Sequence, residues 1–192
     1  MSDDGKSPSE TAFTSRLSPH STENHGMVGT STAMRALFAA LPRIAPSSSA
    51  LLIVGERGTG KALIARAVHA LSDRADGPFT RVDCAALPQQ QARHALSTGL
   101  ESARGGTLVL DHVGKLSMDL QARLLRVMRN EEIEVPANTG GRLDVRIIST
   151  TDTDLEKAVE TGRFREALYC QLNVLSIEVP PLRERGGDVQ VL

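Results

Sequence analysis

The chain has 192 residues, which is enough for one domain with a well-buried core and short for two. A net charge of −1 gives no basic signature of direct nucleic-acid binding, and four Phe, one Tyr and no Trp argue against a base-stacking surface. No apolar run reaches the ~20 residues of a membrane span, and the N-terminus lacks a signal-peptide core, so we expect a cytoplasmic protein.

The N-terminal segment, residues 1–26, is rich in Ser, Thr, Pro and charged residues and poor in aliphatic ones. Such a segment cannot bury enough surface to offset its chain entropy, so it is predicted to be a disordered tail. A phosphorylated or partner-binding arm remains the alternative. The remainder, residues 27–192, is predicted to form the single domain.

The first elements alternate helix and strand. Residues 30–45 begin with Thr and Ser caps and have apolar side chains at helical spacing. Residues 50–55 form a continuous apolar run that ends in Gly, which is typical of a strand buried on both faces. Residues 61–71 are predicted to be helical.

The alternation continues through the middle of the chain. A short strand is predicted at 79–84, and a helix at 89–104 with a break near Gly99. Residues 106–111 form a second fully apolar strand, and 117–130 an amphipathic helix that opens on a capping serine.

The last part adds strands at 143–150 and 174–180 around a helix at 153–162 that ends on a glycine. Strands that alternate with helices predict a parallel sheet covered on both faces, with ligands at the carboxyl ends of the strands. Cys84 and Cys170 lie far apart in apolar-looking contexts, so we expect two buried free thiols rather than a disulfide or metal site.

The stretch GERGTGK fits G-x-x-x-x-G-K and lies between a strand and a helix, the context expected of a phosphate-binding P-loop. The glycines let backbone N–H groups surround phosphates, and the lysine reaches the outer ones. A glycine-rich turn with a surface lysine is the alternative. The predicted cradle comprises Gly55, Glu56, Arg57, Gly58, Thr59, Gly60, Lys61 and Ala62.

The metal position is incomplete. Ala62 stands where many P-loops carry a Ser or Thr hydroxyl for Mg²⁺. Asp111, at the end of the strand TLVLD, is the expected magnesium partner through water, and a helix or turn cap is its alternative.

These stretches, together with VGTSTAM, ADGPFTRVDCAALP, LQARLLRVM, VRIISTTDTDL, GRFREALYCQLNV and PPLRERGGDV, resemble the AAA+ domain of sigma-54-dependent transcription activators. The resemblance runs from about Val28 to Leu192. It implies an α/β fold, a three-layer P-loop NTPase core with a mostly parallel five-stranded sheet, and ATP or ADP with Mg²⁺ as ligands. It also implies that Val28 and Gly29 line the base.

The chain departs from this family in length. Residues 88–104 fill a segment that is about twice as long in the activators and carries their GAFTGA loop, which grips the sigma factor. The sequence stops at GGDVQVL, where the family's helical lid begins, so we expect neither lid nor helix-turn-helix and no direct DNA binding.

The catalytic positions also depart. The family's Walker B motif has Asp then Glu, and here it is Asp111 and His112; the Asn that pairs with that Glu matches Asp83. The Glu positions the attacking water, a task worth roughly 10²–10⁴ in rate, so weak or absent hydrolysis is expected. We hypothesise an Asp83–His112 hydrogen bond that locks this switch; independent drift of both positions is the alternative.

Two further positions complete the candidate site. Sensor I, an Asn in the family, matches Asp152, whose carboxylate would repel a γ-phosphate. The family's two trans-acting arginines, its arginine fingers, match Arg165 and Gln171, so only the first of these two positions keeps a positive charge. A surface salt bridge is the alternative role of Arg165.

Together these features predict an ATP-binding module that is impaired in hydrolysis and acts in sigma-54-type transcription control through protein partners. Such a partner would be a full-length activator, which it would modulate or inhibit, or a second copy of itself, because head-to-tail AAA+ packing admits a defective subunit. The alternatives are a slow ATPase that remodels another target, an interaction module without nucleotide, and a decayed fragment.

Overall fold

A computed structural model describes residues 26–27, 29–86, 89–129, 144–186 and 188. The predicted tail, apart from Gly26, and the predicted base-lining Val28 lie outside the described residues. No helix in these described ranges is long and apolar enough to cross a membrane.

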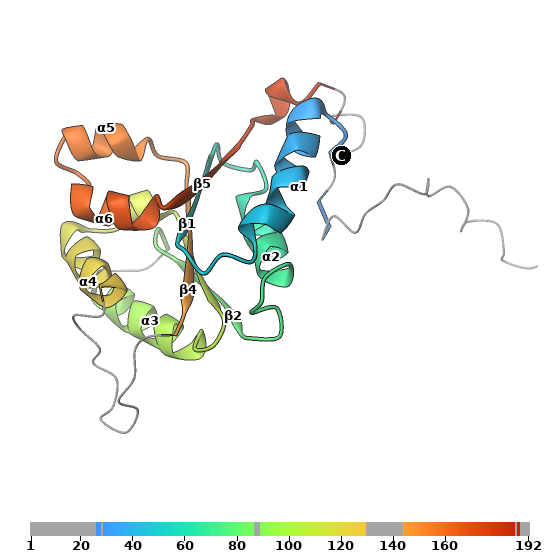
Figure 1. The fold of residues 1–192 in the computed structure, drawn as a ribbon. Helices are drawn as coiled ribbons and strands as arrows, with labels where there is room; N and C mark the ends of the chain where they lie inside the picture. Colours follow the sequence, from blue (N-terminus) through green and yellow to red (C-terminus); the bar gives the residue numbers. More distant parts are fainter. Residues whose placement is uncertain (1–25, 28, 87–88, 130–143, 187, 189–192) are drawn as a thin grey trace, which may run out of the picture.

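A five-stranded sheet of order β2-β3-β4-β1-β5 forms the middle layer, and all its strand pairs are parallel (Figure 1). The central strands β3 and β4 are fully buried: β3 is largely apolar, and β4 carries Ile147 and Ile148 together with buried polar side chains. The strands are β1 (Leu51–Gly55), β2 (Phe79–Asp83), β3 (Thr107–Asp111), β4 (Arg146–Thr151) and β5 (Leu175–Val179).

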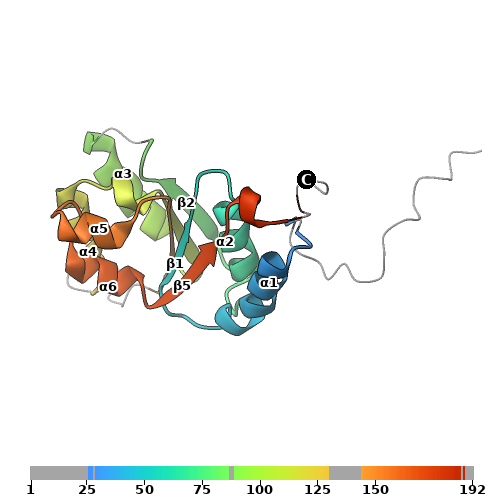
Figure 2. The same cartoon turned by 90° about the horizontal axis from the view of Figure 1, so that it is seen from above.

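Helices cover both faces of this sheet, with α1 and α2 on one side and α3 to α6 on the other (Figures 1 and 2). Two apolar clusters correspond to these sides, one built on α1 and α2 and the other on the remaining helices. The helices are α1 (Thr32–Ile44), α2 (Lys61–Ala70), α3 (Gln89–Ser102), α4 (Met118–Met128), α5 (Leu155–Glu160) and α6 (Glu166–Leu172), with 3-10 turns at Val113–Lys115 and Leu182–Glu184.

Side-chain caps set the starts of three helices. The Oγ atoms of Ser31 and Ser117 accept backbone N–H bonds at the starts of α1 and α4, and the carboxylate of Asp154 does so at α5. The three-layer α/β architecture with its parallel five-stranded sheet is thereby confirmed.

Two local expectations were wrong or incomplete. Helix α3 continues through Gly99, where the sequence predicts a break, because this glycine serves packing: a Cβ there would lie 2.7 Å from Val82 Cγ2 on β2. Helix α6 is not among the elements predicted from periodicity.

Candidate nucleotide site

The P-loop joins the end of β1 to the start of α2 at the carboxyl edge of the sheet. Gly58 and Gly60 have φ values of 82° and 95°, the left-handed region that glycine adopts at no steric cost. Gly55 leaves no room for a side chain, since a Cβ there would lie 2.8 Å from the carbonyl oxygen of Val179. The loop therefore requires its glycines, and the free N–H groups at the start of α2 point into it.

Lys61 is folded onto this loop. Its side chain is buried, and Nζ donates to the carbonyl oxygens of Gly55 and Glu56, each at 2.7 Å. Burial lowers the pKa of Lys61, while the carboxylates of Asp152 and Asp111 oppose that shift. An ammonium satisfied only by two carbonyls is well placed to exchange them for phosphate oxygens.

The segment after β5 holds the loop in place. Arg183 donates to both carboxylate oxygens of Glu56, at 2.8 and 2.6 Å. Buried Arg185 donates through Nη2 to the carbonyl of Thr59 at 2.7 Å and through Nε to that of Pro180 at 2.8 Å. The contacts to Glu56 and Thr59 join residues more than 120 positions apart and were missed in the sequence, which carries no local signal for them.

The same segment reaches the start of α1. Asp188 accepts hydrogen bonds from the backbone N–H groups of Thr30 and Ser31, at 2.6 and 2.8 Å. Burial by itself would raise the pKa of Asp188, but these hydrogen bonds outweigh it and lower the pKa. Gly29, predicted to line the base, lies against this contact, because a Cβ there would meet Met34 Cβ at 2.9 Å.

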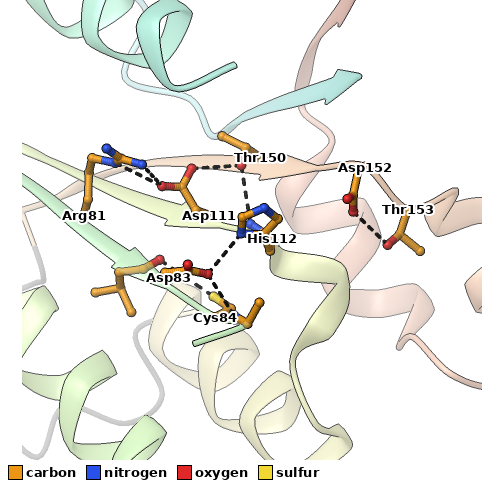
Figure 3. A network of polar contacts seen from close by, with 10 residues as sticks. Arg81, Asp83, Cys84, Asp111, His112, Thr150, Asp152 and Thr153 are labelled. Carbon is orange, nitrogen blue, oxygen red and sulfur yellow. Dashed lines mark hydrogen bonds and ion pairs between the residues drawn. The ribbon is translucent and has the colours of Figure 1, made fainter. Parts of the chain in front are cut away.

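Asp111 lies at the end of β3 and faces α2. Its Oδ2 accepts from Nε and Nη2 of Arg81 at 3.0 and 2.5 Å, and its Oδ1 accepts from Thr150 Oγ1 at 2.9 Å (Figure 3). The sequence analysis did not single out Arg81 or Thr150. The alternation of side chains along β2 was the available signal, since it places Arg81 on the same face as Asp83, the register partner of Asp111.

The residues present do not fit a bound Mg²⁺ well. Position 62 offers a methyl group and no hydroxyl, and both oxygens of Asp111 are already engaged by donors within the protein. Among the described residues, no group of three His, Cys, Asp or Glu side chains is arranged to hold a metal ion. Asp111 as a magnesium ligand stays a prediction from the family pattern.

Asp83 and His112 do meet, as hypothesised. His112 Nδ1 lies 3.0 Å from Asp83 Oδ1 (Figure 3). Burial raises the pKa of Asp83, but hydrogen bonds from Ala85 and from His112 outweigh it and lower the pKa. An ionised carboxylate only accepts, so Nδ1 carries the proton of this pair. His112 has φ of 55° and is the one non-glycine residue with positive φ within the described ranges.

The other predicted catalytic side chains are exposed. Asp152 follows β4, and its Oδ1 accepts from Thr153 Oγ1 at 3.4 Å. Arg165 precedes α6, and its Nε donates to the carbonyl of Met118 at 3.2 Å, so its guanidinium is tethered at the surface without a carboxylate partner among the described contacts. Gln171 is half-buried within α6. The structure does not bring Arg165 or Gln171 to the P-loop of the same chain.

A cavity of about 640 Å³ lies between β5 and the helices α5 and α6 and borders the P-loop. Acidic side chains dominate its wall, so it disfavours a polyphosphate and is distinct from the phosphate cradle. Its charged lining residues are Glu56, Asp152, Asp154, Glu156, Glu178, Arg183 and Glu184.

The two cysteines are free, as expected, but only one is shielded from solvent. Cys84 is half-buried and directly follows β2. Burial, with the nearby carboxylates of Asp83 and Asp111, raises its pKa to about 12. Cys170 is exposed, which corrects the expectation of two buried thiols: it falls on the solvent side of the short helix α6.

Comparison with known protein families identifies the domain. The family described as "Sigma-54 interaction domain" matches residues 28–182. A Nif-specific regulatory protein of Herbaspirillum seropedicae is 46% identical over 182 residues, which is 86% of this chain and 34% of that protein. The transcriptional regulator NtrC of Rhizobium meliloti is 40% identical over 91% of this chain and 40% of its own length.

Solved structures agree. NtrX of Brucella abortus, solved with ADP and with ATP, superposes with a TM-score of 0.78 at 37% identity; the match covers 86% of this chain and about 40% of NtrX. The chain spans roughly a third of the length of the first Nif-specific relatives. The fold, the P-loop and the family match together show that this chain belongs to the sigma-54 interaction domain family of AAA+ transcription activators.

Proposed function

We propose that this chain is a cytoplasmic module of sigma-54-type transcription control that binds ATP and ADP in its P-loop but hydrolyses ATP poorly, and that acts through protein partners. The observation that carries the proposal is the contrast within one site. The loop from Gly55 to Lys61 has its lysine and its glycine geometry, while the water-activating position beside it holds His112 bound to Asp83.

Nucleotide binding is supported by the state of Lys61. Its ammonium has exchangeable carbonyl partners within the loop, and the start of α2 adds N–H groups and a favourable dipole for an anion. That the related NtrX was solved with ADP and with ATP supports an adenine nucleotide as the ligand here.

Poor hydrolysis is supported at three positions. His112 is engaged by Asp83, Asp111 is engaged by Arg81, and Asp152 presents a carboxylate where the family pattern has an amide. The Asp83 contact ties up the residue at the water-orienting position, the Arg81 contact occupies the oxygen that would hold a metal, and the Asp152 carboxylate opposes the charge of the γ-phosphate. Catalysis of phosphoryl transfer depends on water orientation and on positive charge at that phosphate.

Action through partners is supported by the segment between β2 and β3. Between β2 and β3 the structure has helix α3, and neither this helix nor its flanking residues contain a GAFTGA sequence. A direct grip on sigma-54 by that loop is therefore not part of the proposal. We propose instead that the exposed Arg165 flank packs against a full-length activator or a second copy of this chain, in a head-to-tail contact.

Titration calorimetry with ATP and ADP tests the binding step. We expect Kd values in the micromolar to millimolar range for the wild-type protein and a loss of at least ~100-fold for Lys61→Ala, since a charge-assisted phosphate contact disappears. Lys157→Ala, an exposed lysine on α5, is the matched control and should leave Kd unchanged. No heat from wild-type protein at millimolar nucleotide would refute the proposal.

A slow ATPase is the second candidate, and the Asp83 contact favours it. With Nδ1 protonated toward Asp83, the other ring nitrogen of His112 has a free lone pair and can accept a proton from water. Phosphate release that disappears in His112→Ala and persists in Lys157→Ala would establish this function. The double variant Asp83→Asn/His112→Glu restores the family pair and calibrates how much rate the two positions alone control.

A further inference from the structure

Arg81 places a fixed positive charge on the Walker B aspartate. Nε and Nη2 of its guanidinium both donate to Oδ2 of Asp111, at 3.0 and 2.5 Å, and Figure 3 shows the guanidinium beside that carboxylate. Arginine remains protonated at every physiological pH, so this charge is permanent.

The contact follows from the strand register. Asp83 on β2 is the partner of Asp111 on β3, and Arg81 lies two residues earlier on β2, on the same face of the sheet. β2 is an edge strand, so the Arg81 side chain has no further strand beside it and can fold over its neighbour. About half of its surface is exposed, compared with 7% for the Asp111 side chain.

A carboxylate this buried needs donors or a cation, and both are supplied internally. Thr150 Oγ1 donates to the second oxygen, Oδ1, at 2.9 Å. A bound Mg²⁺ neutralises phosphate oxygens and is held by such an aspartate. Here Arg81 already places a positive charge on that aspartate, at the side of the site where the metal would lie.

The second half of a P-loop metal site is absent from the sequence. Ala62 follows Lys61 and offers no oxygen. A hydrated Mg²⁺ near Asp111 would meet a carboxylate neutralised by a guanidinium, which repels a divalent cation. Lys61, bound to carbonyl oxygens of the loop, and Arg81, bound to Asp111, are cations already in place at the ends of β1 and β3 where the phosphates would lie.

We infer that Arg81 substitutes for Mg²⁺ in this site, so that the chain binds ATP and ADP with equal strength whether the metal is present or chelated. This inference rests on the proposed nucleotide binding and specifies its regulation: the site responds to nucleotide concentration and not to magnesium. It assigns Arg81 a positioning role toward Asp111.

The test is calorimetry of the full chain with ATP, in ~5 mM MgCl₂ and separately in excess EDTA. For wild-type protein we expect the two Kd values to agree within about 3-fold. Arg81→Met keeps the apolar stem of the side chain and removes the charge, which frees Asp111; its Kd should become at least ~10-fold weaker in EDTA than in Mg²⁺.

Arg81→Lys is the matched control, because it retains the cation and should retain metal-independent binding. Circular dichroism confirms that each variant is folded, and if Arg81→Met fails to fold, the wild-type and Arg81→Lys titrations decide the question. Wild-type binding that is 10-fold or more weaker in EDTA overturns the inference and leaves the proposed function intact. Absence of binding in both buffers overturns the proposed function and this inference with it.

Discussion

The P-loop and the catalytic edge lie side by side at the carboxyl end of one sheet, yet their charges are arranged in opposite ways. In the P-loop, the hydrogen bonds of Lys61 Nζ within the described residues go to carbonyl oxygens, which a phosphate can replace. At the catalytic edge, the ends of β2 and β3, each carboxylate already has a partner: Asp111 forms an ion pair with Arg81, and Asp83 accepts a hydrogen bond from His112.

The difference shows what each region can still do. A cation satisfied by weak, exchangeable acceptors binds an incoming anion at little cost. A carboxylate paired with a guanidinium has to lose that partner before it can hold a metal or orient water, and breaking a partly buried pair is expensive. Binding and catalysis are therefore separable in this fold, even at adjacent strand ends.

The largest expected effect concerns the thiol at the catalytic edge. Cys84, with its pKa raised to about 12 by burial and by two neighbouring carboxylates, is protonated at pH 8, whereas Cys170 is exposed. Because the thiolate is the reactive form, we expect Cys84 to react with a disulfide reagent at least ~100-fold more slowly than Cys170. Stopped-flow labelling of Cys84→Ser and Cys170→Ser proteins measures each rate separately.

Equal rates in the two single-cysteine proteins would mean that Cys84 becomes exposed to solvent readily and that the Arg81–Asp111 and His112–Asp83 contacts beside it break often. Labelling in urea supplies the reference, since both thiols should react alike once the chain is unfolded.

The next effect concerns the support of the P-loop. Arg185 is buried and donates to two carbonyls, so Arg185→Met leaves both unsatisfied and should lower the free energy of unfolding by about 3 kcal/mol, or roughly 6–12 °C in Tm. Urea denaturation measures this. Arg183→Met removes an exposed pair with Glu56 and is the control, with little expected change because solvent screens such pairs.

If Arg183→Met proved as damaging as Arg185→Met, the loop would be held by its surface ion pair and not by the buried carbonyl contacts. The comparison of the two regions would then need revision, since an ionic partner would support the P-loop as well.

A smaller effect is expected where α3 supports β2, the strand that carries Arg81 and Asp83. In Gly99→Ala the new Cβ would lie 2.7 Å from Val82 Cγ2, so the helix has to shift. Overpacking costs about 1–3 kcal/mol and the gain in helix propensity returns part of it, which leaves a net loss of about 1 kcal/mol. Thr98→Ala, exposed on the same helix, should be neutral, and a neutral Gly99→Ala would contradict the packing role.

Much of this fold was predictable because its signals are local. All five strands were placed. β1 and β3 are nearly continuous apolar runs, as expected of buried parallel strands, and β5 alternates exposed and buried residues. The P-loop followed from seven consecutive residues. Gly99 was misread because a glycine that breaks a helix and one that packs against a strand look identical in a sequence. Helix α6 has only seven residues, too few to show a helical period.

The candidate site was predictable in part. The pairing of Asp83 with His112 was anticipated from the family pattern, and the structure contains that hydrogen bond. Arg81 was not predicted because it belongs to no motif, and only the alternation of side chains along β2 places it on the same face as Asp83 and Asp111. The clamp from Arg185 to Thr59 spans 126 positions, and such a contact depends on tertiary closure that no local pattern encodes.

The last expected effect depends on pH and concerns Asp188, which accepts hydrogen bonds from the residues just before α1 and follows Arg183 and Arg185 in the chain. Hydrogen bonds from Thr30 and Ser31 outweigh burial and hold the pKa of Asp188 below its ordinary value. A group whose pKa is lowered on folding stabilises the protein above its unfolded pKa of about 4, and that contribution is lost as the pH falls through the folded pKa. Asp188→Asn should therefore be less stable than wild type at pH 7.

The stability difference between Asp188→Asn and wild type should shrink as the pH falls from about 5 toward 3, because protonated Asp188 offers the helix no more charge than the amide does. Urea midpoints at stepped pH values measure it. A difference that stays constant over this range would assign the loss to packing at the start of α1. It would also show that the Asp188 carboxylate contributes through packing and not through its charge, unlike the carboxylates of Asp111 and Asp83 at the catalytic edge.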